Sequence, residues 1–292
     1  MTRVLAIDLG GTNLRAAIST GDIGALKVLS REPAPTSLDA LVARINALCA
    51  EAGSVEALGI AVPGLVEGSV CRWIPNLPFL DGVDLQALFP DLRIALGNDA
   101  QIALLAEAVE GSAKGMSDAI LLAIGTGIGS AVLANSRIVA GAHGGACSFG
   151  WACADIKDHG AERSGWLERV ASGRALDALA GQIGLADSRQ LIAAARAGEL
   201  AAQTLLEVPA RQLGTALAGA VALLDPQAVL ISGGLAEALD VMRPPLLAAL
   251  RRQLPSHLRG IEIQPGQFGP PRLQAAAGER GLPFDAAASE VY

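Results

Sequence analysis

Cysteine and histidine side chains gather between residues 141 and 160, in the stretch GAHGGACSFGWACADIKDHG. Thiolate and imidazole groups are ligands that zinc prefers, and a structural zinc site holds four ligands in a tetrahedron. The candidates follow the spacing H-x3-C-x5-C-x5-H and are His143, Cys147, Cys153 and His159. This spacing matches no common zinc pattern, because tight sites usually pair closer ligands. Two interpretations stay open: a relocated zinc site, or cysteines that serve as small buried apolar residues.

Two glycine-rich turns, each between apolar runs, have the chemistry of a phosphate site. LAIDLGGTNLRAAI contains Gly10, Gly11 and Thr12, and LLAIGTGIGSAVL repeats the pattern with Thr126 in the place of Thr12. Glycine leaves backbone N–H groups open to a ligand, and the threonine hydroxyls add donors. Asp8 precedes the first turn, where a carboxylate can hold Mg²⁺ directly or through water. Either turn alone could be a plain hairpin, but two related turns beside an acidic residue favour phosphate binding.

A further polar cluster, GNDA at residues 97–100, follows the apolar run RIALG. Asp99 could simply be the N-cap of the helix predicted for DAQIALLAEAV, because aspartate is a preferred cap. Alternatively, Asp99 lies at the mouth of the cleft that the two phosphate turns would define. A carboxylate there could take a proton from an attacking hydroxyl as a general base.

The runs around these clusters alternate between strand and helix patterns. VLAIDLG and LRAAIST predict a β-hairpin, and SLDALVARINALCAEA predicts a helix with an N-cap at Ser37. Strands are predicted for EALGIAV, RIALG and AVLISGG, and a helix from Leu235. The hairpin pattern recurs after about 114 residues (126 − 12), which suits two homologous domains. The nearly uncharged window AILLAIGTGIGSAVLAN could suggest a membrane span, but its central glycines favour two buried strands joined by a turn.

Composition narrows the class of protein. Of the 292 residues, 51% are hydrophobic and 3% aromatic, which favours an α/β core of alanine and aliphatic residues. The net charge of -7 gives no general attraction to nucleic acid or to anionic membranes. Four cysteines form no disulfide scaffold and suit a reducing compartment. The N-terminus reaches a charge at Asp8 too early for a secretory signal, so we expect a cytoplasmic protein.

Seven segments, taken in order, resemble the successive signature segments of ROK sugar kinases. They are LAIDLGGTNLRAAI, LGIAVPGLVEG, GNDAQIALLAE, LLAIGTGIGSAVL, GAHGGACSFGW, LERVASG and DPQAVLISGG. The resemblance implies an α/β fold of two RNase H-like domains, of the actin-like or hexokinase type, flanking a cleft. Residues 1–116 would form a small N-terminal domain, joined by a C-terminal helix near 271–285, and residues 117–270 a larger domain. It also implies a homodimer that uses ATP and Mg²⁺ to phosphorylate a hexose or amino-hexose, glucokinase-like, at the 6-OH.

The resemblance assigns roles to residues by position. Asp99 corresponds to the general base. The phosphate-binding positions are Asp8, Gly10, Gly11, Thr12 and Asn13 in the first turn and Gly125, Thr126, Gly127 and Gly129 in the second. Adenosine would contact Gly233 and Gly234, and the sugar Gly64, Asn76, Asn98, Asp99 and Glu168. As an alternative, Glu168 could be an exposed charge on a helix surface.

The sequence departs from the family at the sugar and zinc segment. Family members commonly read G-E-I-G-H where this chain has Cys147 to Trp151, so Ser148 replaces the glutamate and Trp151 the histidine. The usual C-x-C-G-x-x-G-C thiolates align with His159, Ala161 and Trp166, and zinc is therefore not expected. We expect apolar packing by Phe149, Trp151 and Trp166 to replace the metal.

Ser148 and Trp151 would then belong to the sugar site, where Trp151 can stack on the apolar face of a sugar ring. Their presence leaves a second function open, a catalytically impaired ROK-type sugar-binding or sensor protein. A DNA-binding domain is not expected, because the chain begins directly at its first phosphate strand.

Overall fold

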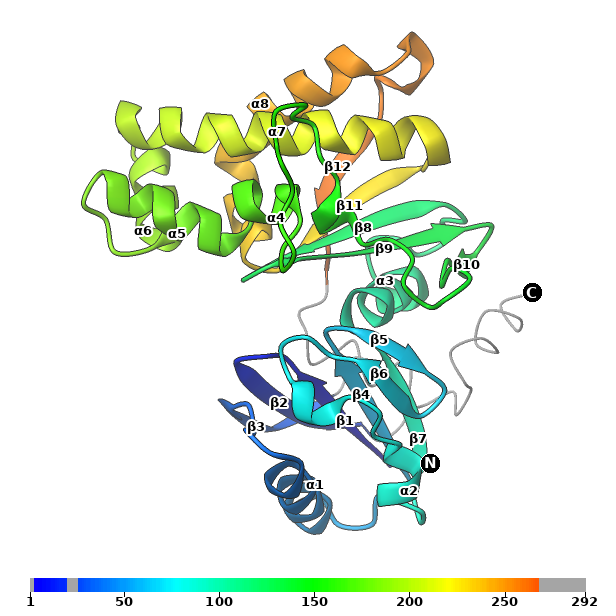
Figure 1. Cartoon of the computed structure of the whole chain (residues 1–292). Coiled ribbons are helices and arrows are strands. Elements are labelled where there is room, and N and C mark those ends of the chain that lie inside the picture. Colours follow the sequence, from blue (N-terminus) through cyan, green and yellow to red (C-terminus); the bar gives the residue numbers. More distant parts are fainter. Residues whose placement is uncertain (1–2, 20–25, 268–292) are drawn as a thin grey trace. The chain divides into compact units, whose positions relative to one another are not determined.

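The computed structural model describes residues 3–19 and 26–267, which form a mixed α/β structure with two five-stranded sheets (Figure 1). The described residues group into two compact units. The first unit comprises those within 1–115 and 136–146, and the second comprises 116–135 and 147–266. The helix predicted near 271–285 lies outside the described residues.

The first sheet has the strand order β3-β2-β1-β4-β7. Its strands are β1 (Val4–Leu9), β2 (Asn13–Ser19), β3 (Lys27–Pro33), β4 (Ala57–Val62) and β7 (Arg93–Asn98). β1 and β2 pair antiparallel, with Leu9 opposite Leu14, which confirms the predicted hairpin. β1, β4 and β7 run parallel. The carboxyl ends of these three strands therefore meet at one edge of the sheet.

Two helices of the first unit begin at polar caps. α1 (Leu38–Ala52) starts at the predicted cap Ser37, whose Oγ accepts a hydrogen bond of 3.2 Å from the Ala40 N–H. Leu41 and Ile45, one turn apart on α1, are buried in the core. α3 (Asp99–Glu110) directly follows β7. The remaining elements are short: β5 (Leu65–Glu67), β6 (Val70–Trp73), η1 (Pro78–Leu80) and α2 (Leu85–Leu88).

The second sheet has the order β10-β9-β8-β11-β12. Its strands are β8 (Ala119–Ile124), β9 (Ile128–Ala134), β10 (Arg137–Ile138), β11 (Ala228–Ser232) and β12 (Glu262–Pro265). β8 pairs antiparallel with β9 and parallel with β11, which in turn pairs parallel with β12. The relation of β8 to its neighbours is that of β1 in the first sheet, as the repeated glycine-threonine pattern predicts.

The window that could have suggested a membrane span forms β8 and β9, two buried strands joined by a tight turn. None of the helices described for residues 3–19 and 26–267 is both long and apolar enough to cross a bilayer.

Helices α4 to α8 belong to the second unit. They are α4 (Trp166–Ala171), α5 (Gly173–Gln182), α6 (Ser188–Arg196), α7 (Leu200–Leu224) and α8 (Leu239–Gln253), with the 3-10 turns η2 (Phe149–Trp151), η3 (Gly234–Ala238) and η4 (Ser256–Leu258). α7 and α8 pack closely (Figure 1), because a Cβ at Gly214 of α7 would lie 2.2 Å from the carbonyl oxygen of Leu246. The helix predicted from Leu235 begins as η3 and continues as α8.

Candidate active site

Polar residues of the first unit gather at the edge where three parallel strands end. Asp8 and the first phosphate turn lie at the end of β1, Gly64 follows β4, and Asn98 and Asp99 end β7 and begin α3. Parallel strand ends with short connections are the usual place for ligand sites in α/β sheets. The sequence predicted each of these residues as part of a site, and the topology brings them together.

Asn98, and not Asp99, is the N-cap of α3. Its Oδ1 accepts hydrogen bonds from the N–H groups of Ala100 (3.0 Å) and Gln101 (3.2 Å). Its Nδ2 donates to the carbonyl oxygen of Gly64 (3.1 Å), which ties the end of β7 to the segment after β4. The alternative that Asp99 is only a helix cap is therefore wrong. Asn98 carries the structural role and leaves the neighbouring carboxylate for another use.

Asp99 is the first residue of α3 and is partly buried. Its Oδ1 accepts a hydrogen bond of 2.7 Å from the Ala100 N–H. Burial raises the pKa of Asp99 to about 7, and the negative charge of Asp8 raises it in the same direction. A carboxyl group whose pKa lies near neutral pH can both take and release a proton under physiological conditions, which is what a general base requires.

Asp8 forms an ion pair with Arg15, whose Nη1 lies 3.0 Å from Asp8 Oδ2. Burial raises the pKa of Asp8, and the Arg15 guanidinium opposes that rise. The sequence interpretation missed Arg15, although a signal was present. In a hairpin that pairs Leu9 with Leu14, the residue opposite Asp8 is Arg15, so working out the register of the predicted hairpin would have placed the two side chains on one face.

The first phosphate turn is closed by a hydrogen bond of 2.9 Å from the Gly10 N–H to the Asn13 carbonyl oxygen. Asn76 packs directly against this turn, since a Cβ at Gly11 would lie 2.7 Å from the Asn76 Cβ. Within residues 3–19 and 26–267, the backbone N–H groups of Gly11 and Thr12 have no acceptor. Two free N–H groups, a threonine hydroxyl and a nearby carboxylate form a donor set that fits phosphate oxygens with Mg²⁺.

The second phosphate turn repeats this closure, with the Gly125 N–H donating to the Gly127 carbonyl oxygen at 3.0 Å. Thr126 at its tip is exposed. Gly129 lies inside β9, opposite Ala123, and is part of the strand ladder beyond the turn. Gly233 packs on the end of β8, because a Cβ there would lie 2.5 Å from the Ile124 carbonyl oxygen, and Gly234 begins η3.

Helices α4 and α5 meet beside the second turn. Glu168 of α4 accepts a hydrogen bond of 3.1 Å from the Ile128 N–H, and only 23% of its side chain is exposed. The alternative that Glu168 is merely an exposed surface charge is therefore wrong. Arg174 of α5 lies 3.3 Å from Glu168 and donates from Nε to the Thr126 carbonyl oxygen at 3.1 Å. The sequence interpretation quoted LERVASG but gave no role to Arg174, which follows that motif.

Ser148 and Trp151 lie close in sequence to Gly150, which contacts Glu168 and the start of β9. Gly150 between them packs against the start of β9, since a Cβ there would lie 2.9 Å from the Ile128 carbonyl oxygen and 3.6 Å from a carboxylate oxygen of Glu168. Ser148 is exposed, and half of the Trp151 surface, 50%, is exposed as well. An indole ring with a free face is able to stack on a sugar.

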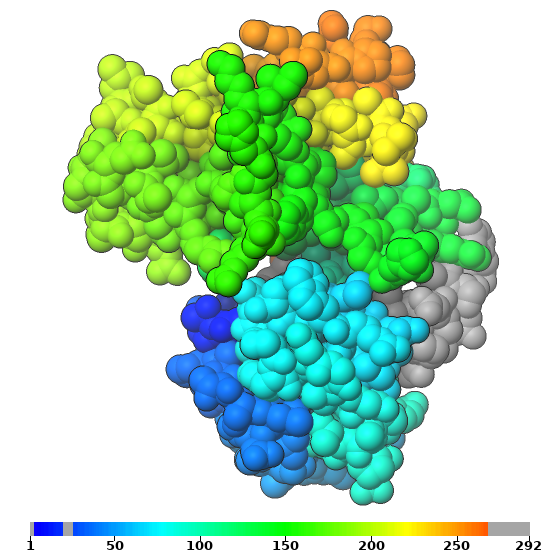
Figure 2. Space-filling model, in the orientation of Figure 1, coloured from blue at the N-terminus to red at the C-terminus, as the bar shows by residue number. Residues whose placement is uncertain are grey.

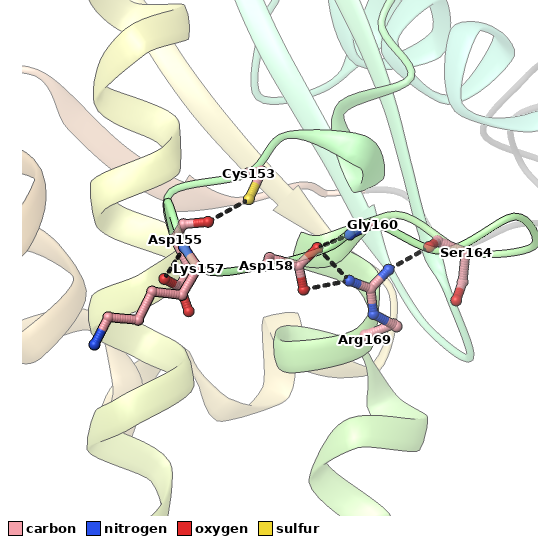
Figure 3. Close-up of polar contacts among 7 residues, drawn as sticks. All are labelled: Cys153, Asp155, Lys157, Asp158, Gly160, Ser164 and Arg169. Atoms are coloured by element: carbon pink, nitrogen blue, oxygen red, sulfur yellow. Dashed lines mark hydrogen bonds and ion pairs between the residues drawn. The ribbon is translucent and has the colours of Figure 1, made fainter.

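The segment that follows is a surface loop, shown in green in the space-filling view (Figure 2). An ion pair fastens it, because Arg169 Nη2 lies 2.8 and 2.6 Å from the two carboxylate oxygens of Asp158 (Figure 3). Arg169 Nη1 also donates to the Ser164 carbonyl oxygen at 2.6 Å, and the Gly160 N–H donates to Asp158 at 2.8 Å.

The predicted aromatic replacement for zinc is therefore wrong in part. Trp166 is buried, with 5% of its surface exposed, but Trp151 is half exposed and cannot be a core residue. The partly buried pair Asp158–Arg169 ties the loop to α4, with one guanidinium nitrogen contacting both carboxylate oxygens and the other donating to the Ser164 carbonyl.

The cysteines of this segment differ in their surroundings. Cys153 is exposed and its thiol lies 3.2 Å from the Asp155 carbonyl oxygen, so the interpretation of Cys153 as a buried apolar residue is wrong (Figure 3). Cys147 is partly buried, and burial raises the pKa of its thiol. In the described part of the chain, no three or more histidine, cysteine, aspartate or glutamate side chains are grouped so that they could hold a metal ion.

The chain is similar in sequence to proteins that are named as sugar kinases. The bifunctional enzyme NanE/NanK of Brucella melitensis biotype 1 is 34% identical over 276 residues, which cover 84% of this chain and 51% of the relative. The chain thus spans about half the length of this relative. The N-acetylmannosamine kinase of Escherichia coli strain 55989 is 34% identical over 254 residues, covering 80% of this chain and 84% of the relative.

Among solved structures, a ROK family glucokinase from Streptomyces griseus, in complex with glucose and AMPPNP, aligns with a TM-score of 0.79. The alignment covers 95% of this chain and 98% of the glucokinase at 24% identity, and it confirms the predicted two-domain, hexokinase-type α/β fold. A sequence profile described as the ROK family matches residues 4–282. The chain therefore belongs to the ROK family.

Proposed function

We propose that this chain is a kinase that transfers a phosphoryl group from ATP to the 6-OH of a hexose or amino-hexose. One observation carries the proposal: Asp99, whose pKa is raised to about 7 by burial, lies at the strand edge beside the first phosphate turn. The kinase names of relatives that are 34% identical support the same reaction class, and N-acetylmannosamine is the first substrate to test.

In the proposed reaction, Asp99 accepts the proton of the sugar hydroxyl while the hydroxyl oxygen attacks the terminal phosphorus of ATP. The O–H bond breaks, the new O–P bond forms, and the bond between that phosphorus and the oxygen of ADP breaks. The Ala100 N–H, 2.7 Å from Asp99 Oδ1, fixes the carboxylate. Because one oxygen is held, the orientation of the other toward a hydroxyl is set before the sugar binds.

Phosphate binding is assigned to the backbone of both turns. In the first unit the N–H groups of Gly11 and Thr12 would bind phosphate oxygens, and in the second unit those of Thr126 and Gly127. Asp8 would hold Mg²⁺ directly or through water. When bound, Mg²⁺ neutralises charge on the phosphates that develops during transfer. Gly233 and Gly234 would contact adenosine, where the lack of side chains lets the ligand approach the backbone.

The proposed sugar contacts include residues of each unit. Asn98 is well suited to position a hydroxyl, since its amide is fixed by Gly64 and by the start of α3. The other proposed sugar contacts are Gly64, Asn76, Ser148, Trp151 and Glu168. Ser148 and Trp151 would give this chain a sugar preference different from that of relatives with glutamate and histidine there.

ADP release in the presence of N-acetylmannosamine, N-acetylglucosamine, glucose and mannose tests the proposal. We expect turnover with at least one sugar in the wild type and none with Asp99→Asn, which keeps the size and the Oδ1 acceptor of the side chain. Sugar binding without turnover across the panel would instead support the sugar-sensor function. Turnover by Asp99→Asn at the wild-type rate would remove Asp99 from the role of base.

Assembly and location also remain proposals. We propose a cytoplasmic homodimer that binds no nucleic acid, in keeping with the net charge of -7. Light scattering on a sizing column measures the assembly directly, and a mass of 29.6 kDa at micromolar concentration would contradict the dimer.

A further inference from the structure

Residues at the junction of α4 and α5 form hydrogen bonds to three successive parts of the second phosphate turn and the residue after it. The Gly173 N–H donates to the Gly125 carbonyl oxygen at 2.7 Å, and Arg174 Nε donates to the Thr126 carbonyl oxygen at 3.1 Å. The Ile128 N–H, just after the turn, donates to Glu168 at 3.1 Å. The backbone of the turn is therefore fixed from one side by residues 40 to 48 positions further along the chain.

Arg174 completes a closed link within this group. Its Nη2 lies 3.3 Å from Glu168 Oε1, while its Nε is bonded to the Thr126 carbonyl oxygen. The other carboxylate oxygen, Oε2, accepts from the Ile128 N–H. Each oxygen of Glu168 is thus connected to the phosphate turn, one directly and the other through the guanidinium of Arg174.

We propose that Arg174 is a positioning residue that couples Glu168 to the second phosphate turn, so that sugar binding and nucleotide binding strengthen each other. The inference deepens the proposed function and rests on it, since Glu168 is a proposed sugar contact and Thr126 a proposed phosphate contact. A nucleotide bound to the turn fixes the Thr126 carbonyl, which accepts from Arg174, and the Ile128 N–H, which donates to Glu168. By thermodynamic linkage, a sugar bound to Glu168 favours nucleotide binding by the same factor.

The close packing makes this link stiff enough to transmit a change. A Cβ at Gly173 would lie 2.6 Å from the Gly125 carbonyl oxygen, and a Cβ at Gly127 would lie 2.7 Å from Glu168 Oε2. Gly173 has no room for a side chain because its neighbour is backbone, and a side chain at Gly127 would displace the Glu168 carboxylate. The turn cannot shift by a few tenths of an ångström without moving the helix corner, and Glu168 moves with it.

Stability alone does not explain the arrangement of Arg174. Its side chain is 63% exposed, and ion pairs with such exposure add little to folding stability because solvent screens them. The guanidinium nevertheless contacts two separate groups with its planar fork, a geometry that lysine cannot reproduce with a single ammonium group.

Calorimetric titration of N-acetylmannosamine and of glucose, with and without saturating Mg-AMPPNP, measures the coupling. We expect the wild type to bind its sugar about tenfold more tightly with the nucleotide present, within the usual range for coupled sites. In Arg174→Ala the ratio should fall by about threefold, the scale of an exposed ion pair. Sugar affinity without nucleotide should change less than twofold, because Glu168 keeps its bond to the Ile128 N–H.

Two further variants separate coupling from simple charge. Arg174→Lys keeps the positive charge but cannot bridge both groups, so the coupling ratio should remain as low as in Arg174→Ala. Arg211→Ala is the matched control, because Arg211 is similarly exposed, 55%, and pairs with Glu207 at 3.1 Å on α7 of the same unit. Its coupling ratio should equal that of the wild type.

The outcomes are distinguishable. Equal coupling ratios in the wild type and Arg174→Ala, with sugar phosphorylation intact, would overturn the role of Arg174 and leave the proposed kinase function standing. Full recovery of coupling in Arg174→Lys would also overturn it, because charge alone would then suffice. If the wild type neither binds nor phosphorylates any sugar of the panel, the proposed function fails and this inference fails with it.

Discussion

Replacing Asp99 by asparagine should make the protein more stable while it abolishes turnover. The pKa of Asp99 is raised from 3.8 to about 7, first by burial and then by the charge of Asp8. The folded state therefore holds the proton more tightly than the unfolded state does. Its stabilising effect is complete below the unfolded pKa, and it is lost as the pH rises through the folded pKa. At neutral pH and above, the wild type folds with a buried carboxylate that asparagine would not carry.

The magnitude follows from the shift of roughly three pKa units. At ~1.4 kcal/mol per unit, the wild type loses on the order of 4 kcal/mol by about pH 8 and about 2 kcal/mol by about pH 5, relative to a neutral side chain. For a chain of this size, about 4 kcal/mol corresponds to a rise in Tm of about 10 °C. Asp99→Asn should therefore melt about 10 °C above the wild type near pH 8 and about half as far above it near pH 5.

Thermal unfolding followed by circular dichroism, at several values between about pH 5 and pH 8, measures this difference. Asp118→Asn is the matched control. Hydrogen bonds from Ser117 and from the Asn135 N–H lower the pKa of Asp118, so its carboxylate stabilises the fold throughout that range. The control should melt below the wild type by an amount that does not grow with pH.

A Tm difference for Asp99→Asn that is absent, or that does not increase from about pH 5 to pH 8, would refute the assignment of a buried carboxylate at this position. The activity profile is an independent check. Since the base must be deprotonated, kcat/KM of the wild type should rise with pH through about 7 and level off above it. A profile that is flat across this range would remove Asp99 from the rate-determining proton transfer.

Three further changes give measurable outcomes. Arg15→Met removes the cation 3.0 Å from Asp8, so the Mg²⁺ concentration that gives half-maximal activity should change by about tenfold, with little change in the KM for sugar. An unchanged Mg²⁺ dependence would contradict a role for the Asp8–Arg15 pair. Gly173→Ala should raise KM for ATP by about tenfold or more, because its Cβ would meet the Gly125 carbonyl at 2.6 Å; unchanged kinetics would show that the turn can shift freely. Arg169→Ala should make the loop around Asp158 sensitive to limited proteolysis, because the ion pair that holds the loop is lost. Zinc chelators should leave the wild-type loop protected. Cleavage of the wild-type loop after addition of chelators would indicate a bound metal.

Much of the first unit could be read from local patterns. The hairpin of β1 and β2, the cap at Ser37 and the strand before GNDA all depend on residues within about fifteen positions of one another. The edge strand β3, KVLSREP, was missed because its side chains are mostly polar and half exposed, so no buried face marks it. β12 was missed for a related reason, as its four residues include only one that is buried.

The loop around Asp158 shows a different limit of prediction from sequence. The sequence predicted aromatic packing by Phe149, Trp151 and Trp166, because the resemblance to the family showed its usual metal ligands missing from this segment. The structure instead relies on Asp158 and Arg169, two residues of ordinary type whose pairing depends on how the loop folds back on α4. A sequence shows which residue types a loop contains, but the pairs that form between them depend on three-dimensional proximity.

The two phosphate turns repeat one topology, yet different parts of the chain hold them in place. In the first unit the partner of Asp8 is Arg15, opposite it in the same hairpin, so counting the register would have been enough to find it. In the second unit Arg174 approaches Thr126 across 48 residues of sequence, from a helix that the repeat does not contain. A repeat therefore predicts the strands and the backbone donors of both turns, but it does not predict side chains such as Arg174 that reach a turn from a helix outside the repeat.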